Sequence, residues 1–181
     1  MKALVNFLQE AEMLSHIPRS GFAFLGSGKQ SVAEHSFTMT LVAHVLARLS
    51  TEPVNHSRLM LLCLFHDFPE ARIGDLNYMQ KRYVQANLEQ ALADIKDASP
   101  LGIEIVEIIN EYEEGKTLEA QLAKDADQLE LLLVLKKEQE LGNPRAALWF
   151  ENACKRLKTA TAQKLATTIL HTSTDEWWLS V

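Results

Sequence analysis

The sequence predicts an all-α protein, a compact bundle of about six or seven helices, and three observations lead to this prediction. Apolar residues recur at intervals of three and four, which is the helical spacing, while alternating strand-like segments are hard to find. Only 7 Gly and 5 Pro interrupt the 181 residues. The composition, with 47% hydrophobic and 23% charged residues, is that of an ordinary globular chain rather than a disordered or fibrous one.

A chain of this length normally folds as one domain. The sequence shows no internal repeat and no linker long enough to divide it. We therefore expect residues 1–181 to form a single domain, with a core over about 1–150 and a C-terminal helix and tail over 146–181.

The first half of the chain predicts three helices. Residues 3–15 place apolar side chains on one face, and a loop follows them. Ser31 and Glu34 form a capping box that begins a helix over about 31–49. The segment 57–68 is apolar on all sides, which is expected of a helix buried at the centre of the fold.

The second half predicts the remaining helices, the longest of which has a clear stop signal in Gly142, Asn143 and Pro144. The expected segments are a mixed polar helix over 77–97, then helices over 101–113, 117–141 and 146–171.

The overall charge narrows the range of partners. A net charge of −6 and a pI near 5.5 argue against a surface that coats a nucleic-acid polymer, because such binding depends on clustered Lys and Arg. A small anionic substrate held by a local positive site remains compatible with this charge. We also expect no membrane span, because no stretch reaches the roughly 18 apolar residues that a span needs.

The two cysteines, Cys63 and Cys154, lie in apolar or amphipathic stretches far apart in the chain. This placement favours packed thiols over a disulfide framework. Together with an N-terminus that lacks a long apolar signal segment, it predicts a protein of a reducing, cytoplasmic compartment.

The pair His66-Asp67 is the first candidate for chemistry, because it ends an apolar helix with two groups that are costly to bury. One interpretation makes His66 a satisfied core histidine and Asp67 the N-cap of the next turn, with Glu70 as its capping partner. The other makes both residues metal ligands.

His35 favours the second interpretation, because it shares a helix face with Met39 and Val42 and so also points inward. Two inward imidazoles and a carboxylate form a mixed nitrogen and oxygen ligand set. Such a set suits one divalent transition metal, Mn, Co, Fe, Ni or Zn, better than Ca or Mg.

A further carboxylate ligand is available on the predicted helix 117–141, where Asp125 and Asp127 compete. Asp125 shares its face with Leu122 and Leu129, whereas Asp127 shares its face with Leu131 and other apolar residues. Periodicity does not choose between them. We expect the aspartate that is not a ligand to be a solvated helix charge.

A His, a His-Asp pair and a final Asp on successive helices resemble the signature of the HD superfamily of metal-dependent phosphohydrolases. The flanking sequences are similar to those of the 5'-deoxynucleotidase-like subgroup, in the same order over roughly residues 1–150. They are Arg19-Ser20-Gly21-Phe22, Ser31-Val32-Ala33-Glu34-His35-Ser36, His66-Asp67-Phe68-Pro69-Glu70-Ala71, Gly74-Asp75-Leu76 and Lys124-Asp125-Ala126-Asp127.

The resemblance implies roles for individual residues. Its Lys-x-Ala-Asp pattern points to Asp127 as the fourth metal ligand, beside His35, His66 and Asp67. It implies that Arg19 binds the phosphate, that Glu70 is catalytic, and that Asp75 serves both catalysis and binding of the substrate ribose. The implied reaction removes the 5'-phosphate from (deoxy)nucleoside monophosphates by metal-activated water, in an enzyme that is a homodimer.

One position departs from the subgroup. Bacterial relatives with established deoxynucleotidase activity carry a Trp directly after the arginine, where this chain has Ser20, with Phe22 two positions further on. If that aromatic helps to exclude the ribose 2'-hydroxyl, selectivity for deoxyribose is in question here.

The sequence is also compatible with other functions. Residues 68–126 contain no histidine, which disfavours a two-metal site. A non-catalytic module, in which the metal clamps helices or the pocket senses a nucleotide, is a different class, and the same fold also serves other small phosphate esters. His16, His44, His56 and His171, and the three tryptophans, are interpreted as packing, surface or subunit-contact residues.

Overall fold

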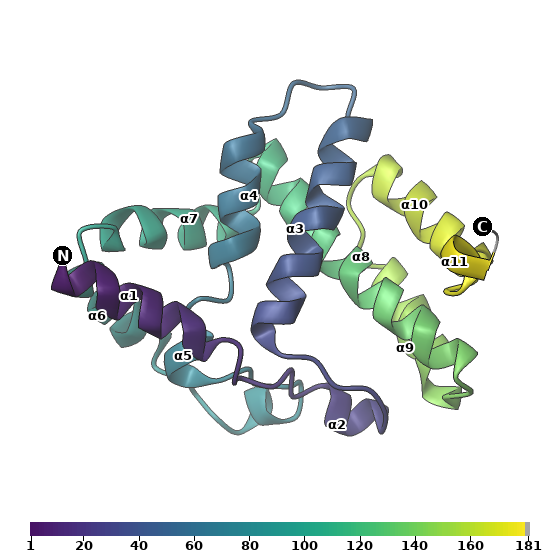
Figure 1. Ribbon diagram of the computed structural model, residues 1–181, viewed down its shortest axis with the longest axis horizontal. Coiled ribbons are helices and arrows are strands. Elements are labelled where there is room, and N and C mark those ends of the chain that lie inside the picture. The colour runs from purple at the N-terminus through teal and green to yellow at the C-terminus, as the bar shows by residue number, and fades with distance from the viewer. Residues whose placement is uncertain (180–181) are drawn as a thin grey trace.

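The structure, a computed structural model, describes residues 1–179, and these contain eleven α-helices, one 3-10 turn and no β-strand. The all-α prediction is therefore confirmed, whereas the expected number of six or seven helices is wrong. In Figure 1 the long helix α8 (Leu118–Glu140) lies behind α3 (Val32–Leu49), with α9 and α10 to one side and α1, α6 and α7 to the other. None of the described helices combines the length and the apolar character that crossing a bilayer would require.

The remaining elements follow in chain order. They are α1 (Lys2–Met13), α2 (Phe22–Leu25), α4 (His56–Phe65), α5 (Glu70–Ile73), η1 (Gln80–Arg82), α6 (Leu88–Ala98), α7 (Gly102–Glu114), α9 (Pro144–Cys154), α10 (Ala160–His171) and α11 (Glu176–Leu179).

The helix count differs because local caps divide two of the expected segments. The predicted helix over 77–97 is only η1 and α6, which begins where the Asn87 side chain accepts a hydrogen bond from the Gln90 backbone. The predicted helix over 146–171 breaks between α9 and α10, where Thr159 caps the second of them. Three further short helices, α2, α5 and α11, lie in segments expected to be loop or tail.

The central apolar helix also differs from its prediction. α4 ends at Phe65, so His66 is its C-cap rather than part of a longer helix. Only one face, with Leu59, Leu62 and Cys63, is buried, while Leu64 is 45% exposed. The prediction from the apolar sequence therefore overestimated the burial of α4, because one side of this helix has no neighbour among the described residues 1–179.

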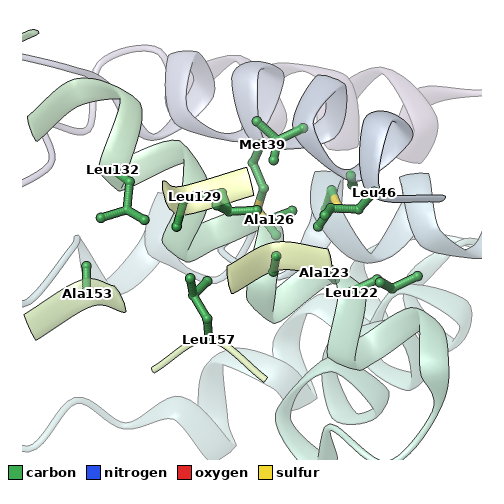
Figure 2. Packing of buried hydrophobic residues seen from close by; sticks show 14 of the residues in the cluster. Met39, Leu46, Leu122, Ala123, Ala126, Leu129, Leu132, Ala153 and Leu157 are labelled. Carbon is green, nitrogen blue, oxygen red and sulfur yellow. The ribbon is translucent and has the colours of Figure 1, made fainter. Parts of the chain in front are cut away.

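The main hydrophobic core surrounds α8, which packs against α3, α4, α7, α9 and α10. Met39 and Leu46 from α3 meet Ala126 and Leu129 from α8, as Figure 2 shows. The small alanine side chains on α8 let the neighbouring helices approach closely, while the leucines fill the space between them. This packing sets the relative positions of α3, α4 and α8, the three helices that carry the candidate site.

A second apolar cluster joins the N-terminal region to α6 and α7, through Leu14, Val32, Phe68 and Ile105 among others. The loop before α3 is held against the start of that helix, because the Val32 backbone donates to the Ile17 carbonyl over 2.9 Å. The Arg19 backbone donates to the Gln30 carbonyl over 2.8 Å. These contacts keep the loop beside the first turn of α3.

Leu132→Ala should lower the free energy of unfolding by about 2–5 kcal/mol, because it removes a fully buried side chain and leaves a cavity in the main core. Leu133→Ala is the matched control on the same helix, since Leu133 is 40% exposed and should cost much less. Urea unfolding of both variants measures the difference, and equal losses would contradict this description of the α8 faces.

Candidate metal centre

Three of the predicted ligands converge at one buried point. His35 comes from α3, His66 is the C-cap of α4, and Asp127 lies on α8. One potential ligand atom from each of them lies within 4.8 Å of the other two. Residues that are far apart in the sequence therefore form a possible metal site.

Asp67, the fourth predicted ligand, lies at the edge of this group. Its Oδ2 is 3.1 Å from His66 Nε2 and 3.9 Å from His35 Nε2. The alternative interpretation, in which Asp67 caps the next turn, does not hold, because Pro69 is the N-cap of α5 and no side-chain hydrogen bond caps that helix. The Asp67 carboxylate is therefore directed towards the two imidazoles.

Local structure sets the positions of the histidines. The capping box predicted at the start of α3 is present: Ser31 Oγ accepts from the Glu34 backbone, and the Glu34 carboxylate accepts from the Ser31 backbone over 2.7 Å. It defines where α3 begins, and His35 follows in the first turn with its side chain fully buried.

Hydrogen bonds also determine which ring nitrogen of each histidine faces the site. His66 Nδ1 lies 3.0 Å from the Cys63 carbonyl, and His35 Nδ1 lies 2.7 Å from a Glu130 carboxylate oxygen. Because both of these oxygens only accept, each Nδ1 carries the hydrogen, and each Nε2 presents its lone pair when the ring is neutral. His35 Nε2 is buried without a hydrogen-bond partner, which is the arrangement that a metal ligand requires.

The carboxylates around the two imidazoles favour the binding of a cation. Burial lowers the pKa of His35, but the facing carboxylates of Asp127 and Glu130 outweigh it and raise that pKa to about 9. Burial raises the pKa of Asp127, yet His35, His66 and Arg19 together hold it well below its usual range. The pKa of Asp67 is also lowered, against the effect of burial, chiefly by His66. Carboxylates that favour a positive charge on His35 also favour a divalent transition metal, which would take the place of the His35 proton.

Asp125 corrects another expectation, because it is not a solvated helix charge. Its side chain is fully buried, and its two oxygens accept from the backbone N–H groups of Lys158 and Thr159 over 2.6 and 2.8 Å. α8 is enclosed on several sides, so both Asp125 and Asp127 point inward, but towards different neighbours. Asp125 holds the turn between α9 and α10, and Asp127 faces the histidines.

Glu130 is a site residue that the sequence interpretation missed. Its carboxylate is fully buried and also accepts from Gln30 Nε2 over 2.5 Å, in addition to its contact with His35. Its position three residues after Asp127 on one helix was the available signal, because such residues share a face. A carboxylate behind a ligating histidine orients the ring and increases its basicity.

Arg19 lies next to the candidate ligands, in the loop before α3. Its Nη1 is 3.9 Å from Asp67 Oδ2, and its side chain is largely buried. Burial lowers the pKa of Arg19, but the carboxylates of Asp127 and Asp67 raise it overall, so the guanidinium keeps its charge. A planar cation with several donors at this position suits a phosphate group.

Glu70 has a very different environment from the other acids. Its Oε2 is buried and has no hydrogen-bond partner. Burial, followed by repulsion from Asp67 and Asp75, raises the pKa of Glu70 to about 8. A carboxyl group that can hold or release a proton near neutral pH is suited to general acid or base catalysis.

Asp75 lies close to the residue at which the sequence departs from its relatives. The Ser20 backbone N–H donates to Asp75 Oδ2 over 2.7 Å, and the Ser20 hydroxyl lies 3.4 Å from the same oxygen. Gly74 precedes it with a φ of 74°, which suits the turn expected for a Gly-Asp dipeptide. Asp75 is therefore held beside Arg19 by the loop that contains Ser20.

A cavity of about 560 Å³ opens beside Arg19 and Asp75. This volume is within the range of small-molecule sites in proteins. Phe22, two positions after Ser20, contributes an aromatic wall, and Trp149 from α9 contributes another. The sequence interpretation treated Trp149 as a packing residue; it does pack against the core, but it also lines this cavity.

The other histidines lie outside the site, as expected. His44 and His56 are exposed and approach each other, with ring centroids 5.9 Å apart. His16 lies 3.1 Å from Glu12 on the surface, and His171 is exposed at the end of α10.

A helical bundle that gathers two imidazoles and a carboxylate at one buried point defines a class of all-α proteins with a histidine and aspartate centre. A family model described as "HD domain" matches residues 11–169, and the chain belongs to this family. It is 30% identical to a 5'-deoxynucleotidase HDDC2 of Mus musculus over 146 residues, which cover 77% of this chain and 72% of the relative.

Two further comparisons agree with this family. The chain is 28% identical to the 5'-deoxynucleotidase VV1113 of Vibrio vulnificus over 174 residues, which cover 87% of this chain and 88% of the relative. Its fold is similar to that of a predicted metal-dependent phosphohydrolase from Magnetospirillum magnetotacticum, with a TM-score of 0.75 and 24% identity over 94% of this chain and 93% of that one.

Exchanging each aspartate of α8 for asparagine should separate their roles. Asp125→Asn should lower the free energy of unfolding by about 1–3 kcal/mol, because two buried backbone donors lose a charged acceptor, and it should leave metal binding intact. Asp127→Asn should show the reverse pattern, with bound metal lost and the α9–α10 turn still held. Denaturant unfolding and elemental analysis of the purified variants measure both effects, and loss of metal from Asp125→Asn alone would contradict the assignment.

Glu130→Gln should raise the dissociation constant for Mn²⁺ or Co²⁺ by about 10–100-fold, because the His35 ring loses its charged partner. Glu138→Gln is the matched control, since Glu138 is also a buried carboxylate on α8 but bonds Ser27 instead. Calorimetric titration of the metal-free proteins gives the two affinities. An equal effect of both changes would show that a general loss of buried charge, rather than the contact with His35, is responsible.

Proposed function

We propose that this protein is a metal-dependent phosphohydrolase that removes the 5'-phosphate from nucleoside monophosphates. The observation that carries the proposal is the His35, His66 and Asp127 group together with Arg19. Arg19 lies 3.9 Å from Asp67 at the edge of that group and also lines the 560 Å³ cavity. Relatives named 5'-deoxynucleotidases in animals and bacteria support the same reaction.

His35, His66, Asp67 and Asp127 would hold one divalent transition metal, Mn, Co, Fe, Ni or Zn. Their donor set, and the unpartnered Nε2 of His35, fit such an ion. When bound, an ion of this kind polarises phosphoryl oxygens and makes water more acidic.

Arg19 would bind and orient the phosphate. Its guanidinium lines the cavity and keeps its charge beside the carboxylates of the centre. Two parallel N–H donors match two phosphoryl oxygens, and this geometry would hold the scissile ester in one orientation. The rest of the cavity would then receive the sugar and the base between Phe22 and Trp149.

Glu70 would move the proton. Its raised pKa lets the same carboxyl group take a proton from the attacking water or deliver one to the departing 5'-oxygen. Asp127 and Glu70 would thus have separate roles because their surroundings differ. Imidazoles lie beside Asp127 and lower its pKa, whereas burial and neighbouring carboxylates raise the pKa of Glu70.

Asp75 would orient the sugar hydroxyl. Only its Oδ2 contacts Ser20 among the hydrogen bonds of this pair, so Oδ1 can accept a bond from the 3'-hydroxyl. We propose that Phe22 replaces, from two positions further on, the aromatic that bacterial relatives carry directly after the arginine. A comparison of hydrolysis rates for deoxyribonucleotides and ribonucleotides tests whether Phe22 fills this role.

The alternative classes lack this support. A metal that only clamps helices, or a pocket that only senses a nucleotide, gives no reason for an unpartnered buried carboxyl oxygen on Glu70. Hydrolysis of another small phosphate ester would use the same groups. Measuring phosphate release from both nucleotides and a non-nucleotide ester distinguishes the two activities.

We also propose a domain organisation, a location and a class of substrate. Residues 1–181 are proposed to act as one domain, although the last two lie outside the described residues. A cytoplasmic location is supported by Cys63 and Cys154, which are both free thiols. The substrate is proposed to be a small nucleotide rather than a nucleic-acid polymer, in keeping with the net charge of −6.

The proposed function is tested by phosphate release from a panel of deoxyribonucleoside and ribonucleoside 5'-monophosphates, with glycerol phosphate as a non-nucleotide ester. Turnover should require added divalent metal, should vanish after chelation, and should be confined to the nucleotides. Bound metal with no turnover on any member of the panel would indicate the clamp or sensor instead.

Glu70→Gln should keep its metal and lose turnover by about 10²-fold or more, because an amide cannot transfer the proton. Glu12→Gln, an exposed acid on α1, is the control and should leave both properties unchanged. Elemental analysis and initial rates on one deoxyribonucleotide give the comparison. Retained activity in Glu70→Gln would remove this residue from the chemistry.

A further inference from the structure

Two of the described residues that line the 560 Å³ cavity are arginines, Arg19 and Arg156, and they come from distant parts of the chain. Arg19 precedes α3, whereas Arg156 follows the end of α9 at Cys154. The backbone N–H of Arg156 donates to the Ala153 carbonyl over 3.0 Å, so a further turn continues beyond α9 and places this residue beside the cavity. The proposed reaction uses Arg19, which leaves the second guanidinium to be explained.

The Arg156 side chain is linked to the candidate metal centre through one glutamine. Its Nε donates to Gln128 Oε1, and Gln128 Nε2 donates to Asp127 Oδ2 over 2.7 Å. These two bonds fix the orientation of the Gln128 amide, because a guanidinium can only donate and an ionised carboxylate can only accept. A single side chain thus holds both the arginine of the cavity and a candidate metal ligand.

The bond from Gln128 distinguishes the two oxygens of Asp127. Oδ2 accepts from Gln128, whereas Oδ1 lies 3.3 Å from His35 Nε2. That nitrogen of His35 is buried without a hydrogen-bond partner. The oxygen that faces the unpartnered imidazole nitrogen is therefore the one that remains for a metal.

The positive charge of Arg156 has a neutral partner. Among the described residues no carboxylate pairs with its guanidinium, and its side chain bonds the amide of Gln128. Arg19 differs, because the carboxylates of Asp127 and Asp67 face it. Nη1 and Nη2 of Arg156 donate to no described residue, and Arg156 is exposed, so a ligand can reach these nitrogens from solvent. An anion would satisfy both the free donors and the charge.

We propose that Arg156 is a second phosphate-binding residue of this cavity, and that Gln128 is a positioning residue that holds Arg156 in a fixed relation to Asp127. The proposal rests on the proposed function, in which the phosphate of a nucleotide binds beside Arg19 and the metal centre. A phosphate monoester carries up to two negative charges at neutral pH. The guanidinium of Arg156 adds positive charge that nearby carboxylates do not offset, as they do at Arg19.

A phosphate accounts for the position of Arg156 better than a base does. The aromatic side chains that suit a base, Phe22 and Trp149, form other parts of the cavity wall. Arg156 is instead tied through Gln128 to Asp127, at the centre where the phosphate is proposed to react. An arginine that contacted the base would also strengthen the binding of nucleosides, and this difference can be measured.

Arg156→Met tests the phosphate contact, by calorimetric titration of inorganic phosphate into the Co²⁺-loaded protein. The dissociation constant for phosphate should rise at least about tenfold, because a charge-assisted hydrogen bond is lost. Arg156→Lys should lose less, since lysine keeps the charge but not the planar fork. Lys155→Met is the matched control, because Lys155 pairs with Glu151 on the surface and does not line the cavity. It should leave phosphate binding unchanged.

Gln128→Met tests the positioning role, because methionine has a similar length and makes neither hydrogen bond. The dissociation constant for Co²⁺ should rise about tenfold or more. The visible absorption of the bound Co²⁺ should also change, because Asp127 is no longer held with one oxygen towards His35. Gln121→Met is the matched control on α8 and should change neither property, since the Gln121 amide donates to the Lys116 carbonyl.

Neither titration depends on turnover, so the result for Arg156 and Gln128 is separate from that for the proposed function. A wild type that binds phosphate and Co²⁺ with these dependences, but hydrolyses no nucleotide, would contradict the proposed function and support the binding roles. Circular dichroism checks that each variant folds. A folded Arg156→Met that binds phosphate as tightly as the wild type, or that loses affinity for deoxyadenosine as much as for phosphate, would overturn the role of Arg156. Unchanged Co²⁺ affinity and absorption in Gln128→Met would overturn the role of Gln128.

Discussion

The structure depends on the carboxylates that α8 buries and on the partners that each of them requires. An ionised carboxylate removed from water is stable only when it is hydrogen-bonded or paired with a positive charge. Asp125 meets this demand through two backbone N–H groups, Asp127 through the facing imidazoles, and Glu130 through His35 and Gln30. Glu138, nearer the end of the helix, bonds Ser27.

The hydrogen-bond partners of these carboxylates lie in separate segments of the chain, and α8 connects those segments. Asp125 holds the turn between α9 and α10, while Glu130 and Glu138 hold the loop that runs from Arg19 to the start of α3. That loop in turn places Ser20 against Asp75. One helix thus links the candidate metal centre, Arg19 and the wall of the cavity, so the candidate site and the folding energetics share the same contacts.

The acids of the site are distinguished by what surrounds them rather than by their chemical type. Asp127 has cationic neighbours and stays ionised, which suits a metal ligand. Glu70 is buried among other carboxylates and holds its proton more firmly, which suits proton transfer. α3 shows a similar division between its two sides, because its inner face supplies the buried His35 while its outer face exposes Phe37, Leu41 and Val45.

The sequence by itself determined the all-α class and most of the long helices, because apolar periodicity and the Ser31 capping box are local properties. It also placed His35, His66 and Asp67 as candidate ligands, since an imidazole on an apolar helix face points inward wherever that helix packs. Only the tertiary structure decided the rest. Asp125 and Asp127 are equivalent by periodicity, and neighbours more than thirty residues away give one of them backbone donors and the other imidazoles. Glu130, Trp149 and the exposed side of α4 were missed for the same reason, because burial depends on which segments come to lie beside a helix.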